Sequence, residues 1–237
     1  MNQTWSIVVF CFNEVHTVEK VVAKLVTIFE THRPDLYEIL IVDDGSSDGS
    51  AAVIRKIAEK YPTVRPLFHE INRGIGHALR TGYFNARHEN ITAVPADGQF
   101  DTNELIAHLN IDQNTFVSFY RIENTTYTFA RNALSFSNRM VNKVFLGFDL
   151  KDVNWVKIYK TEDLRQLGLE IESSLVESEI CAKLRVMGRR VVQVESRYHP
   201  REAGMSKGAS WKIVRQALGD TLALARVLQR FRSAQKK

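Results

Sequence analysis

The chain has 237 residues, of which 44% are hydrophobic and 25% are charged. This composition is typical of a globular protein with one sizeable core, so we expect one domain with at most one appended element. The first residues lack the basic region and the cleavage site of a signal peptide, and no run approaches the roughly 18 apolar residues that cross a bilayer. Two cysteines are too few for a disulfide framework, so a cytoplasmic protein is expected.

The net charge of +5 belongs to the C-terminus. From residue 206 onward there are eight Lys or Arg and one acid, whereas residues 1–205 hold 24 basic and 26 acidic residues. The body of the protein is therefore slightly acidic, and no basic stripe interleaved with aromatic residues occurs in it. These features argue against a nucleic-acid-binding protein.

Through the first hundred residues, short apolar runs alternate with segments whose apolar residues recur at helical spacing. The pattern predicts strands at 5–12, 37–42, 64–69 and 91–95, with helices around 18–28, 50–61 and 74–86. Strands that alternate with helices predict an α/β fold in which a mostly parallel sheet has helices on both faces.

The second half of the chain is less regular. Strands are predicted near 115–119, 156–159 and 190–194, and helices at about 132–145, at 177–187 and at the C-terminus. No internal repeat or Pro/Gly-rich linker divides the chain. We therefore predict one domain over residues 1–207, followed by a basic amphipathic helix over residues 208–237.

Polar clusters follow three of the predicted strands. Asn13 and Glu14 follow the first strand, Asp43 and Asp44 the second, and the segment 97–99 the fourth. In open α/β sheets, ligands bind beyond the carboxyl ends of the strands. We therefore expect these clusters to meet in one crevice.

Each cluster has a structural and a functional interpretation. Asp43 and Asp44 can form a turn that caps the next helix, or one of them can accept hydrogen bonds from a ribose or base. Asp97 and Gln99 can form a turn, or they can supply the hard oxygen ligands that Mg²⁺ or Mn²⁺ prefers and leave room for diphosphate oxygens. The metal interpretation is favoured for Asp97 and Gln99.

Two further segments contain glycine beside polar residues. The segment 72–77 lacks the third glycine of a dinucleotide fingerprint and follows the third strand, which excludes a dinucleotide site there. Arg201 and Lys207 flank Gly204 in the predicted loop 199–207. These cations either bind diphosphate, if the loop folds over the crevice, or form a solvated basic loop.

The order of these motifs resembles family 2 glycosyltransferases. It is most similar to dolichol-phosphate mannosyltransferases and related polyprenyl-phosphate glycosyltransferases, from about residue 6 to residue 207. The resemblance is carried by Phe-Cys-Phe-Asn-Glu at 10–14, Val-Asp-Asp-Gly-Ser at 42–46, Asn-Arg-Gly-Ile-Gly at 72–76, Ala-Asp-Gly-Gln at 96–99, and Arg201 with Gly-Met-Ser-Lys at 204–207. It implies the GT-A fold, an inverting transfer, and a divalent cation between the protein and the donor diphosphate.

The resemblance also implies roles for individual residues. Asp97 and Gln99 would hold Mg²⁺ or Mn²⁺, and Arg121, Arg201 and Lys207 would contact phosphate oxygens. The donor, a GDP- or UDP-sugar, would bind its nucleoside part against Phe10, Phe12, Glu14, Val42, Asp43, Asp44 and Ala96. The chain departs from its relatives at Pro95, where they have a first metal-motif carboxylate, and at residues 152–155.

The nature of the acceptor decides whether a base is needed. Breaking the bond from sugar C1 to phosphate develops negative charge on the leaving diphosphate, which a metal ion and fixed cations such as Arg201 stabilise. A polyprenyl phosphate is already an anionic nucleophile, whereas a glycan hydroxyl calls for a general base. Asp152 is the candidate base, with a capping or salt-bridged aspartate as the alternative. A third interpretation is a nucleotide-binding protein without turnover.

The C-terminal helix combines an apolar stripe with basic residues. Trp211, Val214, Leu218, Leu222, Ala225, Leu228 and Phe231 recur at helical spacing, with Lys and Arg elsewhere around the helix. Such a helix either lies on an anionic membrane, here the cytoplasmic face, or packs on its own core or on a partner subunit. The charge imbalance favours the membrane.

Overall fold

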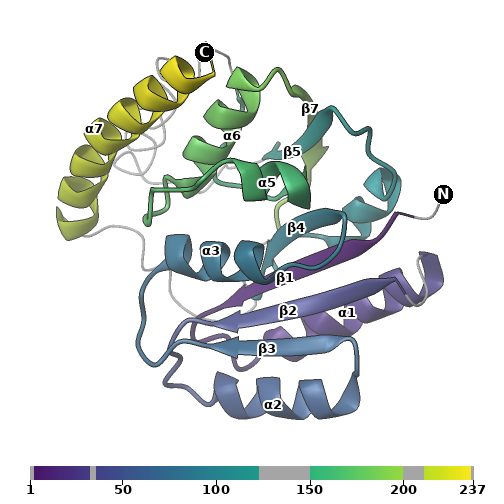
Figure 1. Cartoon of the computed structure of the whole chain (residues 1–237). Coiled ribbons are helices and arrows are strands. Elements are labelled where there is room, and N and C mark those ends of the chain that lie inside the picture. Colours follow the sequence, from purple (N-terminus) through teal and green to yellow (C-terminus); the bar gives the residue numbers. More distant parts are fainter. Residues whose placement is uncertain (1–2, 33–35, 123–149, 200–210, 236–237) are drawn as a thin grey trace.

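A seven-stranded sheet runs through this computed structural model (Figure 1). The structure describes residues 3–32, 36–122, 150–199 and 211–235, and for residues 211–218 it describes the backbone alone. The strands are β1 (Trp5–Cys11), β2 (Tyr37–Asp43), β3 (Val64–Phe68), β4 (Asn90–Pro95), β5 (Thr115–Arg121), β6 (Lys157–Lys160) and β7 (Arg190–Ser196). Their spatial order is β3-β2-β1-β4-β6-β5-β7. Only β6 runs antiparallel to its neighbours in this sheet.

Helices cover both faces of the sheet. They are α1 (Val18–His32), α2 (Ser50–Lys60), α3 (Ile75–Asn85), the 3₁₀ helix η1 (Thr102–His108), α5 (Thr161–Gln166), α6 (Val176–Val186) and α7 (Trp211–Ala234). Ile7 and Val9 of β1 join a core with α1, α2 and η1, while Val8 between them joins a second core with α3, α5, α6 and α7. This division follows from the alternation of side chains along a strand. The predicted mostly parallel sheet with two helical layers is confirmed.

The predicted elements lie within a few residues of the observed ones where the structure describes them. The short elements η1 and α5 are absent from the sequence prediction, because six or seven residues are too few to establish a helical period. The helix predicted at 132–145 and the loop residues 200–207 lie outside the described residues.

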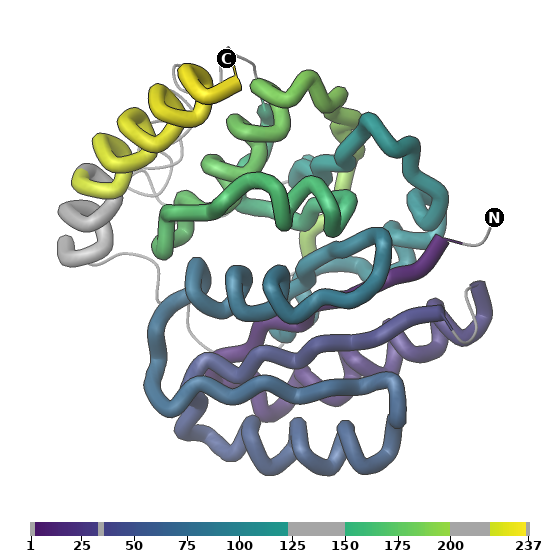
Figure 2. The backbone as a smooth tube through the Cα atoms, viewed as in Figure 1, coloured from purple at the N-terminus to yellow at the C-terminus, as the bar shows by residue number. Residues whose placement is uncertain are grey.

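Helix α7 packs beside α6, as Figures 1 and 2 show. Leu224, Val227 and Leu228 are buried against this layer, whereas Leu222 is 63% exposed. The predicted stripe is therefore rotated, because Leu222 belonged to it and Leu224 and Val227 did not. The positions of the predicted stripe are on average less than 3.6 residues apart, so the stripe moves gradually around the helix instead of staying on one face. Among the described residues, no helix is both long and apolar enough to span a membrane.

Candidate active site

The carboxyl ends of the first four strands meet at one edge of the sheet. In the strand register, Cys11 lies opposite Asp43, Phe10 lies opposite Pro95, and Asp43 lies opposite Phe68. The backbone N–H of Ala96 continues this alignment by donating to the Phe10 carbonyl at 3.1 Å. The predicted convergence of the three polar clusters at this edge is thus seen in the register.

The loops after β1 and β2 are joined by hydrogen bonds. The Asn13 N–H donates to Ser46 Oγ at 2.9 Å, and the Ser47 N–H donates back to Asn13 Oδ1 at 2.8 Å. Asn13 takes a φ of +56°, a conformation that asparagine tolerates better than most residues. Asp43 Oδ1 accepts from the Ser46 hydroxyl and from its N–H at 3.3 Å. The two loops therefore form one unit, and Asp43 is part of what holds it.

The carboxylate of Asp44 organises the loop before α3. It accepts from the N–H groups of Arg73 and Gly74 at 2.9 and 2.8 Å, and from Asn72 Nδ2 at 3.0 Å. His69 Nδ1 lies 2.7 Å from Asp44 Oδ1. Asp44 is only 3% exposed. Asp44 therefore holds the loop before α3 and does not cap α2, whose N-cap is Gly49, and its contact with a ribose or base stays a prediction.

The other residues predicted around the nucleoside differ in accessibility. Phe10, Phe12 and Glu14 are half-buried at the strand edge. The side chains of Val42 and Ala96 lie in the two cores, with 0% and 1% exposed surface. A ligand at this edge would therefore meet Val42 and Ala96 through their backbone rather than their side chains.

Close backbone approaches explain two glycines of the motifs. A Cβ on Gly45 would lie 2.4 Å from the carbonyl carbon of Ile71, and its φ is +69°. A Cβ on Gly76 would lie 2.1 Å from the Glu172 carbonyl oxygen. Gly76 therefore lets the start of α3 pack against a neighbouring loop.

Asp97 and Gln99 lie together just beyond β4. The Gln99 N–H donates to Asp97 Oδ1 at 3.1 Å, and its side-chain nitrogen donates to the Tyr198 hydroxyl. Because the Gln99 nitrogen faces Tyr198, the side-chain oxygen is the atom suited to a metal. One carboxylate and one amide oxygen form a hard donor set that fits Mg²⁺ or Mn²⁺ with diphosphate oxygens as further ligands. No group of three or more His, Cys, Asp or Glu suited to a metal occurs among the described residues.

Arg121 and Asp152 are paired beside this site. Arg121 Nε lies 2.7 Å from Asp152 Oδ2, and a terminal nitrogen lies 3.2 Å from Oδ1. The guanidinium lies 4.8 Å from the ring centroid of Trp155 and 5.9 Å from that of Tyr198. Asp152 Oδ1 also accepts from the Asn154 N–H at 3.1 Å. The structure thus shows the salt-bridged alternative for Asp152, with Arg121, which was predicted to contact phosphate, as its partner.

Tyr198 is the site residue that the sequence analysis missed. It contacts Gln99 and Arg121, and its ring lies 5.9 Å from that of Trp155. Tyr198 stands two residues after the end of β7, so inspection of the carboxyl end of every strand, rather than the first four, would have found it. Arg201 and Lys207 lie outside the described residues, so their contact with phosphate stays a prediction.

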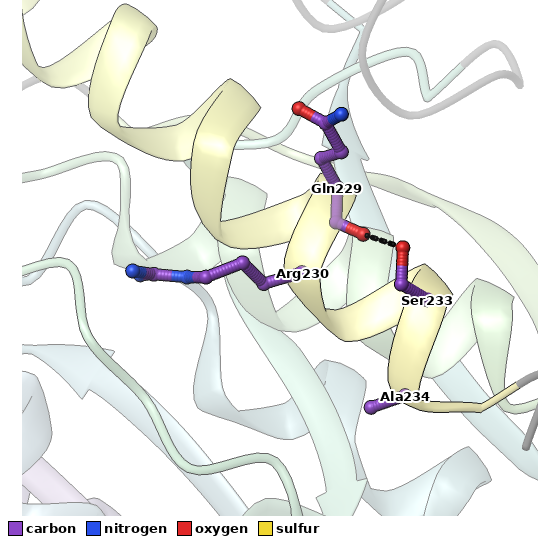
Figure 3. Close-up of a pocket in the computed structure, with 4 residues that line it drawn as sticks. All are labelled: Gln229, Arg230, Ser233 and Ala234. Carbon is purple, nitrogen blue, oxygen red and sulfur yellow. Dashed lines mark hydrogen bonds between the residues drawn. The ribbon is translucent and has the colours of Figure 1, made fainter.

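Two hollows in the described part of the chain lie away from these residues. One of about 490 Å³ is lined by residues of β5, β7 and the segment after η1. Another of about 500 Å³ is lined by Gln229, Arg230, Ser233 and Ala234 of α7 (Figure 3). Among the residues that the structure describes, no predicted site residue lines either hollow, so the candidate site rests on the strand-edge geometry.

Comparison with known sequences agrees with the motif pattern. Residues 6–168 match the family model of glycosyl transferase family 2. A human dolichyl-phosphate beta-glucosyltransferase is 44% identical over 64 residues, which cover 26% of this chain and 20% of that protein. A bactoprenol glucosyl transferase of Shigella phage SfV is 27% identical over 217 residues, which cover 90% of this chain and 69% of that protein. The chain matches less than a third of the length of the dolichyl-phosphate glucosyltransferases.

Solved structures share the fold. A mannosyltransferase from Pyrobaculum calidifontis, in complex with GDP-Man and Mn²⁺, aligns with a TM-score of 0.62 and 20% identity over 99% of this chain and 74% of that chain. Glucosyl-3-phosphoglycerate synthase from Mycobacterium tuberculosis, in complex with Mn²⁺, UDP-Glc and phosphoglyceric acid, aligns with a TM-score of 0.67 and 17% identity over 94% of this chain and 80% of that chain. The predicted GT-A fold is confirmed.

Proposed function

Because this chain belongs to glycosyl transferase family 2, we propose that it is an inverting hexosyltransferase that uses a nucleoside-diphosphate sugar as donor and a polyprenyl phosphate as acceptor. The similarity to the bactoprenol glucosyl transferase extends over 90% of the chain. An undecaprenyl-phosphate mannosyltransferase from Micrococcus luteus is 24% identical over 72% of this chain and 75% of its own length. Both names specify a polyprenyl acceptor, the second as its phosphate, and this agreement carries the proposal.

The pairing of Asp152 supports a phosphate acceptor over a hydroxyl acceptor. Each oxygen of its carboxylate accepts a hydrogen bond from Arg121, and Oδ1 accepts another from the Asn154 N–H. A carboxylate held in this way is poorly placed to take a proton from a hydroxyl. A phosphate monoester can attack sugar C1 as an anion, so the bond from C1 to the donor diphosphate breaks without removal of a proton from the acceptor.

The residues of the chain would divide the remaining work. Asp97 and Gln99 would hold Mg²⁺ or Mn²⁺, and the ion, when bound, would neutralise charge on the donor diphosphate. Arg121, held in place by Asp152 and Trp155, would present a fixed cation to phosphate oxygens. Arg201 and Lys207 would add cations from the loop before α7.

The C-terminal helix would hold the enzyme at the cytoplasmic face of a membrane. Its buried side packs against α6, and Arg226, Arg230 and Arg232 are exposed on the rest of its surface. Attraction of these arginines to anionic lipid, rather than insertion of an apolar stripe, fits this arrangement. A lipid-linked acceptor would then be within reach of a protein bound to the surface.

An acceptor panel tests the proposed function. The purified chain is incubated with GDP-mannose or UDP-glucose, Mn²⁺ or Mg²⁺, and either undecaprenyl phosphate, dolichyl phosphate or a glycan, and products are identified by mass spectrometry. We expect a polyprenyl-phosphate sugar. Transfer to the glycan alone would refute the acceptor, and donor binding with neither transfer nor hydrolysis would identify a nucleotide-binding protein.

A further inference from the structure

A buried lysine lies beneath the loop that carries Asp152 and Trp155. Lys157 is the first residue of β6 and is 2% exposed. Its ammonium donates to the carbonyl of Trp155 at 2.9 Å and to the carbonyl of Val153. The ammonium thus joins two carbonyls that stand two residues apart in the loop.

Other hydrogen bonds of this loop involve groups other than the carbonyls of Val153 and Trp155: the Asn154 N–H donates to Asp152 Oδ1, and Lys151 and Trp155 donate to side chains of β7. Residues 150–156 form neither helix nor strand, so the carbonyls of Val153 and Trp155 do not accept the regular backbone hydrogen bonds of a helix or a sheet. Buried carbonyls need partners, because one left without a hydrogen bond costs free energy. The Lys157 ammonium therefore supplies the hydrogen-bond donor for the carbonyls of Val153 and Trp155.

The charge of the lysine is balanced from the opposite side. Glu177 Oε2 of α6 lies 3.5 Å from the Lys157 ammonium. Tyr159 and Tyr83 each donate to Glu177 at 2.6 Å, which holds the carboxylate in place. Burial, followed by the charge of Glu177, raises the pKa of the Tyr83 hydroxyl well above its ordinary value, so this tyrosine stays a hydrogen-bond donor. The cluster anchors the loop to α6 and α3.

The loop in turn determines the surroundings of Arg121. Asp152 and Trp155, on either side of Val153 and Asn154, make the ion pair and the ring contact with the guanidinium. A shift of the loop would therefore release Arg121 from both. We propose that Lys157 is a positioning residue, whose contacts with the carbonyls of Val153 and Trp155 fix the orientation of Arg121. Its catalytic consequence rests on the proposed transfer reaction.

The chain contains a matched control for this arrangement. Lys183 of α6 is 1% exposed, donates to the carbonyls of Leu167 and Gly168 at 2.9 Å each, and pairs with Glu179 at 2.7 Å. Its chemistry thus repeats that of Lys157, but no candidate site residue lies in the loop that it holds. A generic loss of buried charge should affect both lysines alike.

The test compares Lys157→Met with Lys183→Met in the full chain. Hydrogen–deuterium exchange of the folded proteins is expected to rise at residues 150–156 in the first variant and at residues 167–171 in the second. In the transfer assay, Lys157→Met should lower kcat by at least about tenfold and change donor KM by less than about threefold, because Arg121 acts on the reacting phosphates. Lys183→Met should keep kcat within about twofold of wild type.

A second variant covers the case in which Lys157→Met does not fold. Lys157→Met with Glu177→Gln removes the uncompensated carboxylate, and the same exchange and kinetic changes are expected from it. The proposal would be overturned if Lys157→Met showed the same exchange at residues 150–156 as wild type, or if it kept wild-type kcat despite faster exchange. An equal loss of kcat in Lys183→Met would also overturn it. If wild type transfers no sugar, the proposed function fails, and the exchange measurement alone decides whether Lys157 holds the loop.

Discussion

Arg121 and Asp152 are 31 residues apart in the chain and form a two-point ion pair, with the shorter contact at 2.7 Å. Two planar groups joined at two points fix each other's orientation, and such pairs are stronger than single contacts. The pair stands against Trp155 and near Tyr198, which also contacts Gln99. Asp152 is therefore expected to act through Arg121, and substitutions of the two residues should differ in size.

Arg121→Ala should lower kcat/KM for transfer by about 100-fold, since a cation that stabilises a developing phosphate charge contributes about 2–3 kcal/mol. Asp152→Asn should lower it by only about tenfold, because the amide keeps the shape of the carboxylate and part of its hydrogen bonding. Steady-state kinetics with a polyprenyl phosphate acceptor measure both.

The control for this comparison is Asp163→Asn, which weakens the similar two-point pair between Asp163 and Arg189 away from the site. It should lower stability and leave kcat/KM near wild type. A loss in Asp152→Asn that exceeds about 1,000-fold would instead indicate a general base and a hydroxyl acceptor.

The metal site leads to a second prediction. Asp97→Asn should abolish transfer, because Asp97 is the charged side chain of the proposed Asp97–Gln99 donor set and a neutral amide binds a hard cation weakly. Chelation of divalent ions should remove wild-type activity, and Mn²⁺ or Mg²⁺ should restore it. Asp101→Asn is the matched control, because Asp101 caps η1 by accepting from the Asn103 N–H. Full wild-type turnover in excess chelator would contradict the metal assignment.

The sequence predicted the strand edge better than the pairs around Arg121. Buried runs followed by polar residues are local features, and the parallel register then brings Cys11, Asp43 and Pro95 to one edge. The direction of β6 is not local, because four residues that pair antiparallel to β4 and β5 carry no signal of orientation. Since the loop before β6 carries Asp152, its pairing with Arg121 could not be predicted.

The burial of three residues discussed above was also not predicted from the sequence. The family resemblance implied that Val42 lines the nucleoside site, yet its side chain points into a core. A strand buried on both faces gives no alternation from which to choose the exposed side. Lysine is a residue type that is normally exposed. Lys157 and Lys183 are buried here because each lies beside a buried glutamate, Glu177 and Glu179 respectively.

The ion pair of Glu89 and Lys160 makes stability depend on pH. The hydrogen bond from Lys160, at 2.9 Å, holds the pKa of Glu89 below its ordinary value of 4.5. A lowered carboxyl pKa stabilises the fold above the ordinary value, and this contribution is lost as the pH falls through the folded pKa. Glu89→Gln should therefore lower the free energy of unfolding at pH 7 and have little effect near pH 3.

The size of that effect should be modest. The Glu89 side chain is 38% exposed, so solvent screens the pair and we expect about 1 kcal/mol at most. Urea unfolding at the two pH values measures it. Glu162→Gln is the control, because its contact with Arg165 is 3.8 Å long and exposed on both sides. An equal loss at pH 7 and pH 3 would show that the Glu89 effect is not electrostatic.

The last prediction concerns how α7 meets a membrane. Removal of the helix would expose the core, since Leu224, Val227 and Leu228 are buried in it. Replacing Arg226, Arg230 and Arg232 by Gln leaves that packing intact and removes three exposed positive charges. Arg230 also loses its contact with Glu170, but an exposed pair of this kind contributes little to stability. The triple variant should therefore fold as wild type does.

Binding to vesicles of anionic lipid separates the two roles of the helix. Each basic residue near such a surface contributes about 1 kcal/mol, so the loss of three should weaken sedimentation with the vesicles by about 100-fold, and added salt should weaken wild-type binding in the same direction. Lys24, Lys56 and Lys60 are exposed on α1 and α2, which cover the opposite face of the sheet. Their replacement by Gln changes the net charge equally, so wild-type binding in this control would locate the membrane contact at α7. Equal losses in both triple variants would point to a nonspecific effect of net charge, and undiminished binding of the arginine variant would leave α7 with a packing role alone.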